Sequence, residues 1–293
     1  MLAVAHSLSL LSRSGEPIRT LDEWRDKRQA VNTGWVPGKS AWEIANAWVG
    51  SGEPRVPPEF QLLLESHKLS AGILTDRGIV ELKTPLCYSS GPRNHDLALW
   101  ARNDSPTAFI GIESKANDGF GETIQQQIDK AERTRLRGKN TNLKQRAEWL
   151  SQSLLGVALS SDKDQDPNGD AEGQEARAKV LQLPYQLLAG VAGTLLEARD
   201  ARSQVAIFVV HQFRTSYTND REIKADAKRL HRFASLLVSA NQSQDDQARI
   251  RVPLRCGSLV GPIYLKSQGQ GAWAMPSQIP LLIGEIQTDR TRS

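Results

Sequence analysis

The chain has 293 residues, of which 39% are hydrophobic and 24% charged, and this composition is that of a soluble globular protein with a sizeable core. The two cysteines, Cys87 and Cys256, form no CxxC pair, which excludes a disulfide framework and disfavours a cysteine zinc site. No stretch approaches the roughly 20 apolar residues needed to cross a bilayer, so we expect a cytoplasmic protein. The formal net charge of +4 permits a polyanionic partner without requiring one.

The first residues predict short helices. One is expected over residues 20–29, and a second begins at Ser40, because Ser40 and Glu43 have the spacing of a capping box. Three residues near one face of the second helix indicate core packing: Trp42, Ala45 and Trp48. Residues 1–56 are therefore predicted to form an N-terminal helical extension.

The middle of the chain predicts one helix followed by three strands. The helix is expected over residues 58–68 and the first strand within residues 78–88, where Pro85 makes the strand an edge strand or ends it early. Two further strands, 95–102 and 107–116, flank the turn sequence Asn-Asp-Ser-Pro at residues 103–106. A helix should follow from about residue 121.

The second half of the chain predicts an insertion, an apolar helix and a buried strand, followed by an amphipathic helix and two strands. Residues 160–173 are acidic, small and polar, which is typical of a mobile insertion, placed here near residues 160–175. An apolar helix over 183–201 contains Gly190 and Gly193, which permit close packing, and leads into a buried strand over 205–213. The remaining expected elements are an amphipathic helix over 221–240 and strands around 257–265 and 279–286.

Strands and helices in this mixed order predict an α/β fold, a central mixed β-sheet flanked by helices. Residues 214–293 are expected to complete the same domain.

Three ionisable side chains are expected to converge on the second and third of these strands. In a hairpin around residues 103–106, Asp96 lies opposite Glu113 or Lys115, with cross-strand Cβ distances of roughly 4.5–5.5 Å. Glu113 and Lys115 are two residues apart, so they point to the same face.

The neighbours of these side chains are apolar, so burying two acids there costs several kcal/mol unless a cation compensates. Mg²⁺ prefers oxygen ligands, and the carboxylates of Asp96 and Glu113 with the carbonyl of Ser114 would form half of its shell. Lys115 would orient a nucleophile or stabilise developing phosphate charge. The alternative is a surface Glu–Lys pair beside an unrelated aspartate.

Asp96, followed after a hairpin-length gap by Glu113-Ser114-Lys115, resembles the motif of the PD-(D/E)XK nuclease superfamily. Asn94-His95-Asp96 stands at the "PD" position, so the proline is absent. The resemblance implies a restriction-endonuclease-like core over residues 57–213, with helix, three-stranded meander, helix and strand in that order. It also implies phosphodiester hydrolysis with Mg²⁺ or Mn²⁺, with Asp96, Glu113 and Lys115 as catalytic residues.

The resemblance further implies an acidic metal ligand on the first core helix, for which Glu65 is the first candidate and Glu59 the rival. It implies nucleic acid as partner, DNA in preference to RNA, and leaves a homodimer open. A basic run after the motif could follow a phosphate backbone or could be a solvated helix face: Lys130, Arg133, Arg135, Arg137, Lys139, Lys144 and Arg146. Lys130, Arg133, Arg137 and Lys139 are the predicted nucleic-acid contacts. The alternative function is a non-catalytic module on the same fold that binds nucleic acid or protein.

Overall fold

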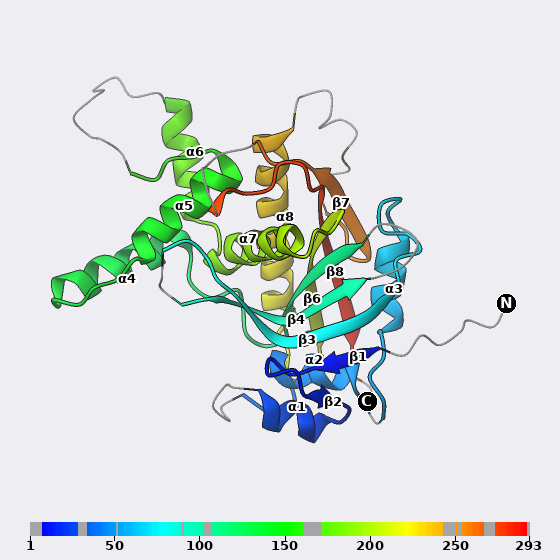
Figure 1. Ribbon diagram of the computed structural model, residues 1–293. Coiled ribbons are helices and arrows are strands. Elements are labelled where there is room, and N and C mark those ends of the chain that lie inside the picture. The colour runs from blue at the N-terminus through cyan, green and yellow to red at the C-terminus, as the bar shows by residue number, and fades with distance from the viewer. Residues whose placement is uncertain are drawn as a thin grey trace.

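The computed structural model describes residues 8–28, 34–50, 52–88, 91–101, 107–160, 171–242, 250, 254–266 and 273–291. These residues form one eight-stranded mixed sheet with helices on both faces (Figure 1). The strand order is β2-β1-β3-β4-β5-β6-β8-β7. The predicted α/β class, with a central mixed sheet flanked by helices, is confirmed.

The centre of the sheet is a meander of three antiparallel strands followed by a parallel strand. These are β3 (Thr75–Thr84), β4 (Arg93–Ala101), β5 (Ala108–Lys115) and β6 (Val205–Arg214), in that spatial order. All eight residues of β5 are buried, which suits the apolar residues 108–112 and leaves the polar Glu113, Ser114 and Lys115 buried at its end. β3 ends directly before Pro85, as the missing N–H of proline requires.

Both edges of the sheet come from segments outside this centre. β8 (Leu281–Asp289) lies parallel to β6, and β7 (Ser258–Ile263) completes that edge. At the other edge, β1 (Ser9–Leu11) runs parallel to β3 and pairs with β2 (Pro17–Ile18). The N-terminal segment was predicted as helical only, but it also contributes these two short strands.

One face of the sheet is covered by α5 (Leu143–Leu155), α7 (Tyr185–Asp200) and α8 (Asp220–Asn241). α7 packs closely because its glycines lack a Cβ. A Cβ at Gly190 would lie 2.6 Å from the Phe208 ring, and one at Gly193 would lie 2.9 Å from His95 Nε2. The close packing expected from these glycines is confirmed.

The other face is covered by α1 (Leu21–Lys27), α2 (Ser40–Trp48) and α3 (Pro58–Glu65), whose apolar side chains form a second core with the sheet. The capping box predicted at Ser40 is wrong. Glu43 Oε1 accepts the N–H of Gly38 at 2.8 Å, while Ser40 Oγ donates to Asp118 Oδ2 at 2.5 Å. Tertiary contact with the loop after β5 therefore replaces the local cap.

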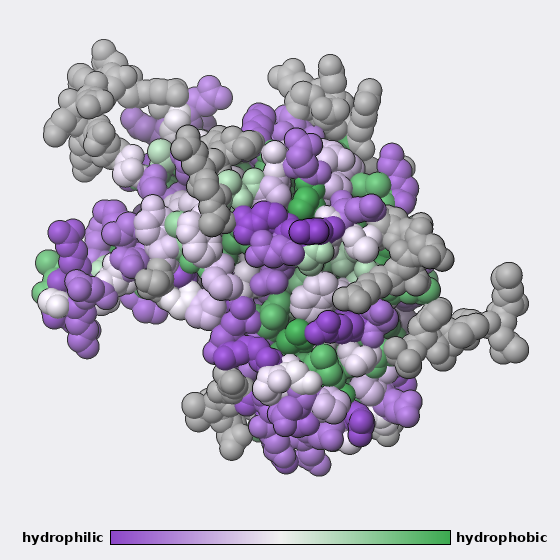
Figure 2. Space-filling view, viewed as in Figure 1, coloured by the Kyte–Doolittle hydropathy of each residue, from purple (hydrophilic) through white to green (hydrophobic). Residues whose placement is uncertain are grey.

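Two helices lie apart from these layers. α4 (Ile124–Leu136), capped by a Thr123–Gln126 capping box, reaches outwards at the left of Figure 1, and its surface is mostly hydrophilic (Figure 2). α6 (Ala171–Leu181) occupies part of the predicted insertion, while residues 161–170 and the predicted turn 103–106 lie outside the described residues. In the described part of the chain, no helix is both long and apolar enough to span a bilayer.

Candidate functional site

The pairing of β4 with β5 brings Asp96 to the level of Glu113. Leu97 pairs with Ile112, and this is where the regular ladder ends. One residue further, Asp96 Oδ2 accepts the N–H of Ser114 at 2.7 Å. The carboxylate of Asp96 thus accepts a hydrogen bond from the backbone of β5 next to Glu113. This contact lies at the point where the pairing of β4 with β5 ends.

Glu113 is the centre of an ion cluster. Its side chain is 4% exposed, Lys115 Nζ donates to its Oε1 at 2.7 Å, and Arg93 Nη2 donates to its Oε2. Both carboxylate oxygens therefore face a cation. The predicted convergence of Asp96, Glu113 and Lys115 is present, and Arg93 joins them from the first position of β4.

Lys115 is held in a largely desolvated position, 7% exposed, with its ammonium 5.5 Å from the centre of the Phe120 ring. Burial lowers the pKa of Lys115 below its ordinary value, and the nearby carboxylates of Asp96 and Asp118 oppose that shift. An ammonium in such a place is poised to donate hydrogen bonds to an anion or a water rather than to bulk solvent.

Two further acids lie near this cluster and were not anticipated. Asp118 follows β5 and accepts from Ser40 Oγ, and Asp226 on α8 is bound by Arg229 at 2.8 Å. Burial raises the pKa of Asp226, while Arg229 opposes the shift. Asp226 is far from the motif in sequence, so no local signal could have found it. Arg93, three residues before Asp96, looks in the sequence like any polar strand entry.

Glu65, the predicted additional metal ligand, does not join these residues. Its Oε1 accepts the N–H of Gly72 at 3.2 Å, close to where β3 begins, whereas Glu113 lies at the end of β5 level with the end of β3. The reason is the direction of α3, whose first turn rather than its last lies at the site's end of the sheet. The rival Glu59 accepts from Thr288 Oγ1 and lies 3.9 Å from His211 Nε2, on the opposite face of the sheet.

The donor set for a metal is therefore two carboxylates, Asp96 and Glu113, with the backbone of Ser114 between them. Among the described residues, no group of three or more His, Cys, Asp and Glu side chains is arranged to hold a metal ion. Asp96 Oδ1 accepts no hydrogen bond within this part of the chain and is the free oxygen of the site. Mg²⁺ suits such a set because it retains several waters and needs few protein ligands.

The predicted basic contacts lie on α4 and the loop that follows it. Lys130 is bound to Glu122 at 3.1 Å. By contrast, the side chains of Arg133, Arg137 and Lys139 are exposed and make no hydrogen bond or ion pair with the described residues. Of the four predicted contacts, these three remain free, within the described part of the chain, to meet an external anion.

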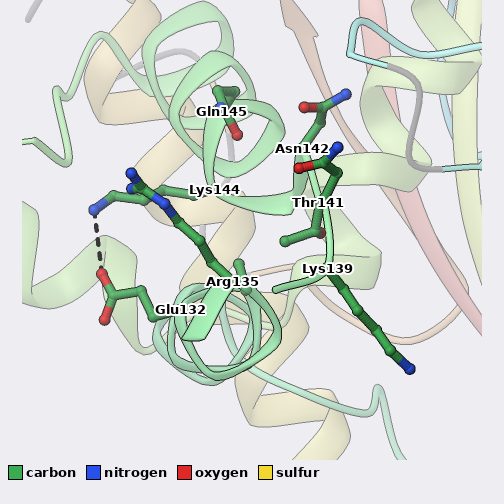
Figure 3. Close-up of a pocket in the computed structure, with 9 residues that line it drawn as sticks. Glu132, Arg135, Lys139, Thr141, Asn142, Lys144 and Gln145 are labelled. Atoms are coloured by element: carbon green, nitrogen blue, oxygen red, sulfur yellow. Dashed lines mark hydrogen bonds and ion pairs between the residues drawn. The ribbon is translucent and has the colours of Figure 1, made fainter. Parts of the chain in front are cut away.

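A hollow of about 390 Å³ lies between α4 and α5 in the same region, lined among others by Glu132, Arg135, Lys139 and Lys144 (Figure 3). Lys144 binds Glu132 at 3.2 Å across it, and Lys139 points away from Arg135. The hollow is therefore lined by both acidic and basic side chains. The excess positive charge of this region comes from the free cations and not from the lining of the hollow.

Arg146, the last member of the basic run, is buried and has a structural role. It donates to the carbonyl oxygens of Cys87 and Gly91 at 3.0 and 2.6 Å, and also to that of Tyr88. It therefore ties α5 to the chain between β3 and β4, just before Arg93.

Comparison with known proteins finds one family and no individual relative. Residues 17–263 match the model of a family described as a domain of unknown function, DUF6946, and this stretch includes the whole ion cluster. No curated protein and no solved structure matches the chain. Since the match covers well over half of its length, the chain belongs to the DUF6946 family.

Proposed function

We propose that this protein is a Mg²⁺-dependent nuclease of the PD-(D/E)XK kind that hydrolyses a nucleic-acid phosphodiester, with DNA preferred over RNA. The observation that carries the proposal is the meeting of Asp96, Glu113 and Lys115 where β4 and β5 separate. Two acids and a desolvated lysine at one point of a buried sheet are costly to maintain, and phosphodiester hydrolysis uses all three.

In this proposal Asp96 and Glu113 hold Mg²⁺ or Mn²⁺, with the carbonyl of Ser114 as a third oxygen. The bound ion would lower the pKa of a water and stabilise the charge that develops on the phosphate. Asp96 supports this role because its Oδ1 is free while its Oδ2 is fixed by Ser114 N–H. The carboxylate is therefore already oriented, which lowers the entropic cost of binding.

Lys115 directs the attacking water and the phosphate. Its short contact with Glu113 holds the ammonium in place, and burial strengthens its electrostatic effect on a developing negative charge. The exposed Arg133, Arg137 and Lys139, on α4 and the loop that follows it, would bind the phosphate backbone beyond the site. We also propose a cytoplasmic location, in which the free thiols of Cys87 and Cys256 stay reduced.

The experiment is cleavage of labelled single- and double-stranded DNA and of RNA by the full chain with Mg²⁺, Mn²⁺ or EDTA. Lys115→Ala should lower the rate constant by at least about a hundredfold, because a donor to the developing charge is lost. The matched control is Lys68→Ala, an exposed lysine outside the cluster, which should cleave like the wild type. Metal-dependent cleavage that survives in Lys115→Ala, or its absence from the wild type on all three substrates, contradicts the proposal.

A second candidate function has one observation in its favour. Glu113 is already neutralised by Lys115 and Arg93, as in a purely structural ion cluster. The protein would then be a non-catalytic module that binds nucleic acid or protein through the same fold. Metal titration separates the two functions: a module of this kind shows no Mg²⁺- or Mn²⁺-dependent thermal stabilisation that Asp96→Ala removes.

A further inference from the structure

Arg93 is the member of the ion cluster that the motif does not explain. Its side chain is 10% exposed, and Nη2 is bound to Glu113 Oε2. Its Nε is buried and has no hydrogen-bond partner in the described chain. Burial lowers the pKa of Arg93, which the nearby Asp96 opposes. The guanidinium is thus anchored to the sheet through a single carboxylate.

This arrangement differs from that of the other buried arginine of the region. Arg146 donates to three carbonyl oxygens and has the contacts of a permanent anchor. Arg93 has a donor to spare in a place where an unpaired donor is costly. A movement of the guanidinium that brings this donor to a second acceptor would therefore be favourable.

The formal charges of the four side chains in the ion cluster sum to zero without any added ion, and Asp118 and Asp226 lie beside the cluster. Asp96 and Glu113 are negative, Lys115 and Arg93 are positive, and the positions of both cations are set by Glu113. A divalent ion at Glu113 would have to approach an oxygen that Arg93 already covers. Arg93 and a divalent cation are therefore competitors for the same carboxylate.

We propose that Arg93 is the built-in counter-cation of Glu113 and that it exchanges Glu113 for a phosphate oxygen of the substrate, which opens Glu113 to the divalent ion. The proposal rests on the nuclease function proposed above and assigns Arg93 as a substrate-binding residue of that site. A guanidinium suits this exchange, because its planar fork matches phosphate as well as carboxylate and its second donor gains a partner.

The exchange makes metal and nucleic acid bind cooperatively. A phosphodiester that binds Arg93 removes the competitor of the metal, and by linkage the metal then tightens the binding of the phosphodiester to the same degree. The protein alone would hold the divalent ion weakly, and the site would load fully only when substrate is present.

The test is isothermal titration of Mg²⁺ into the full wild-type chain and into Arg93→Gln, without nucleic acid. Arg93→Gln should bind Mg²⁺ about tenfold more tightly or better, which corresponds to about 1.4 kcal/mol. The matched control is Arg229→Gln, which removes a positive charge near the cluster that is bound to Asp226 and not to Glu113. This control should leave the Mg²⁺ affinity within about twofold of the wild type, because the effect of a screened charge is small.

The second arm repeats the titration with a phosphorothioate-linked DNA oligonucleotide, which keeps its charge and resists hydrolysis. Mg²⁺ affinity should increase in the wild type and stay constant in Arg93→Gln. Equal Mg²⁺ affinity of the wild type and Arg93→Gln without nucleic acid overturns the proposal. If Arg93→Gln does not fold, the two titrations of the wild type are decisive. A wild-type Mg²⁺ affinity that is the same with and without the oligonucleotide also overturns the proposal.

These outcomes are distinct from failure of the proposed function. Tighter Mg²⁺ binding by Arg93→Gln in a protein that cleaves no nucleic acid supports the counter-cation role and contradicts the nuclease. If the wild type cleaves nucleic acid but Arg93→Gln binds Mg²⁺ no more tightly than the wild type does, the nuclease function is supported and the exchange is contradicted.

Discussion

His211 shows how burial sets the charge of a single residue in this fold. The side chain is fully buried on β6, Nε2 lies 2.8 Å from Thr288 Oγ1, and the ring stacks on Phe213 at 4.1 Å between centroids. Desolvation, with a smaller contribution from the positive charge of Arg290, lowers the pKa of His211 from 6.5 to about 3. His211 is therefore neutral in the folded protein at pH 7, although Glu59 lies 3.9 Å away.

We expect this histidine to make the protein sensitive to acid. Between the unfolded pKa of 6.5 and the folded pKa of about 3, the unfolded chain binds a proton that the folded chain does not. Lowering the pH through that interval therefore favours unfolding, by about 3 kcal/mol between pH 7 and pH 4 for this residue. Urea denaturation of the wild type and of His211→Gln at both pH values measures the effect.

The variant should lose less stability than the wild type over the same interval, because it has no group to protonate at that position. His95 is also buried with a lowered pKa and is retained in both proteins, so its contribution cancels in the comparison. An identical loss of stability in the two proteins would show that His211 is not the source.

At the scale of the element, α4 is a projecting helix that contributes little to the hydrophobic core. Only Ile124 and Ala131 of this helix are buried, and its N-terminal capping box stabilises its first turn. Its exposed cations can therefore be replaced without disturbing a core. Lys130 is bound to Glu122, whereas Arg133 and Arg137 are free within the described chain, so these exposed cations have different surroundings.

We expect these cations to contribute unequally to nucleic-acid binding. Each of Arg133→Gln and Arg137→Gln should weaken binding and reduce the slope of log K against log salt by about 0.9, the value for one lost phosphate contact. Lys130→Gln, the matched control on the same helix, should change the slope less because Glu122 already neutralises that lysine. Fluorescence anisotropy of a labelled DNA duplex at several NaCl concentrations provides the slopes. Equal slopes for the wild type and all three variants would show that α4 does not contact the DNA.

At the scale of the whole molecule, the sheet is enclosed by two cores, and the N-terminal segment supplies much of one of them. β1 extends the sheet beside β3, and α2 packs against β5 and β6. The segment before residue 57 contributes several fully or almost fully buried side chains to this face: Leu10, Ile18, Trp24, Ile44 and Trp48. Structurally, the segment is an integral layer of the domain.

We expect a chain that lacks residues 1–56 not to fold cooperatively. Each of the large side chains lost stabilises the fold by about 1.5–3 kcal/mol, so their sum matches the whole stability of about 5–15 kcal/mol of a typical domain. Guanidinium denaturation followed by circular dichroism measures this. A sharp transition with the full-length m-value in the shortened chain would show that residues 57–293 are sufficient. The point variant Leu62→Ala, at an exposed position of α3, should leave stability within about 0.5 kcal/mol.

The sequence by itself determined the features that depend on local periodicity. The apolar stretches 108–112 and 205–210 predicted strands β5 and β6, and Pro85 predicted the end of β3, because burial and the missing proline N–H act within a few residues. The two-residue spacing of Glu113 and Lys115 and the length of the hairpin were sufficient to bring Asp96 to them. These relations are set by strand geometry and need no distant partner.

Only the tertiary structure decided which other residues share the site. The direction of α3 moved Glu65 away, and the fold brought Asp226 near Lys115 from a helix more than 100 residues later. It also assigned Arg93 to Glu113, while Arg146 became an anchor for the preceding loop. A charged side chain has the same sequence signature whether it meets solvent or a buried carboxylate, because its partner is chosen by the packing of elements that are distant in the chain.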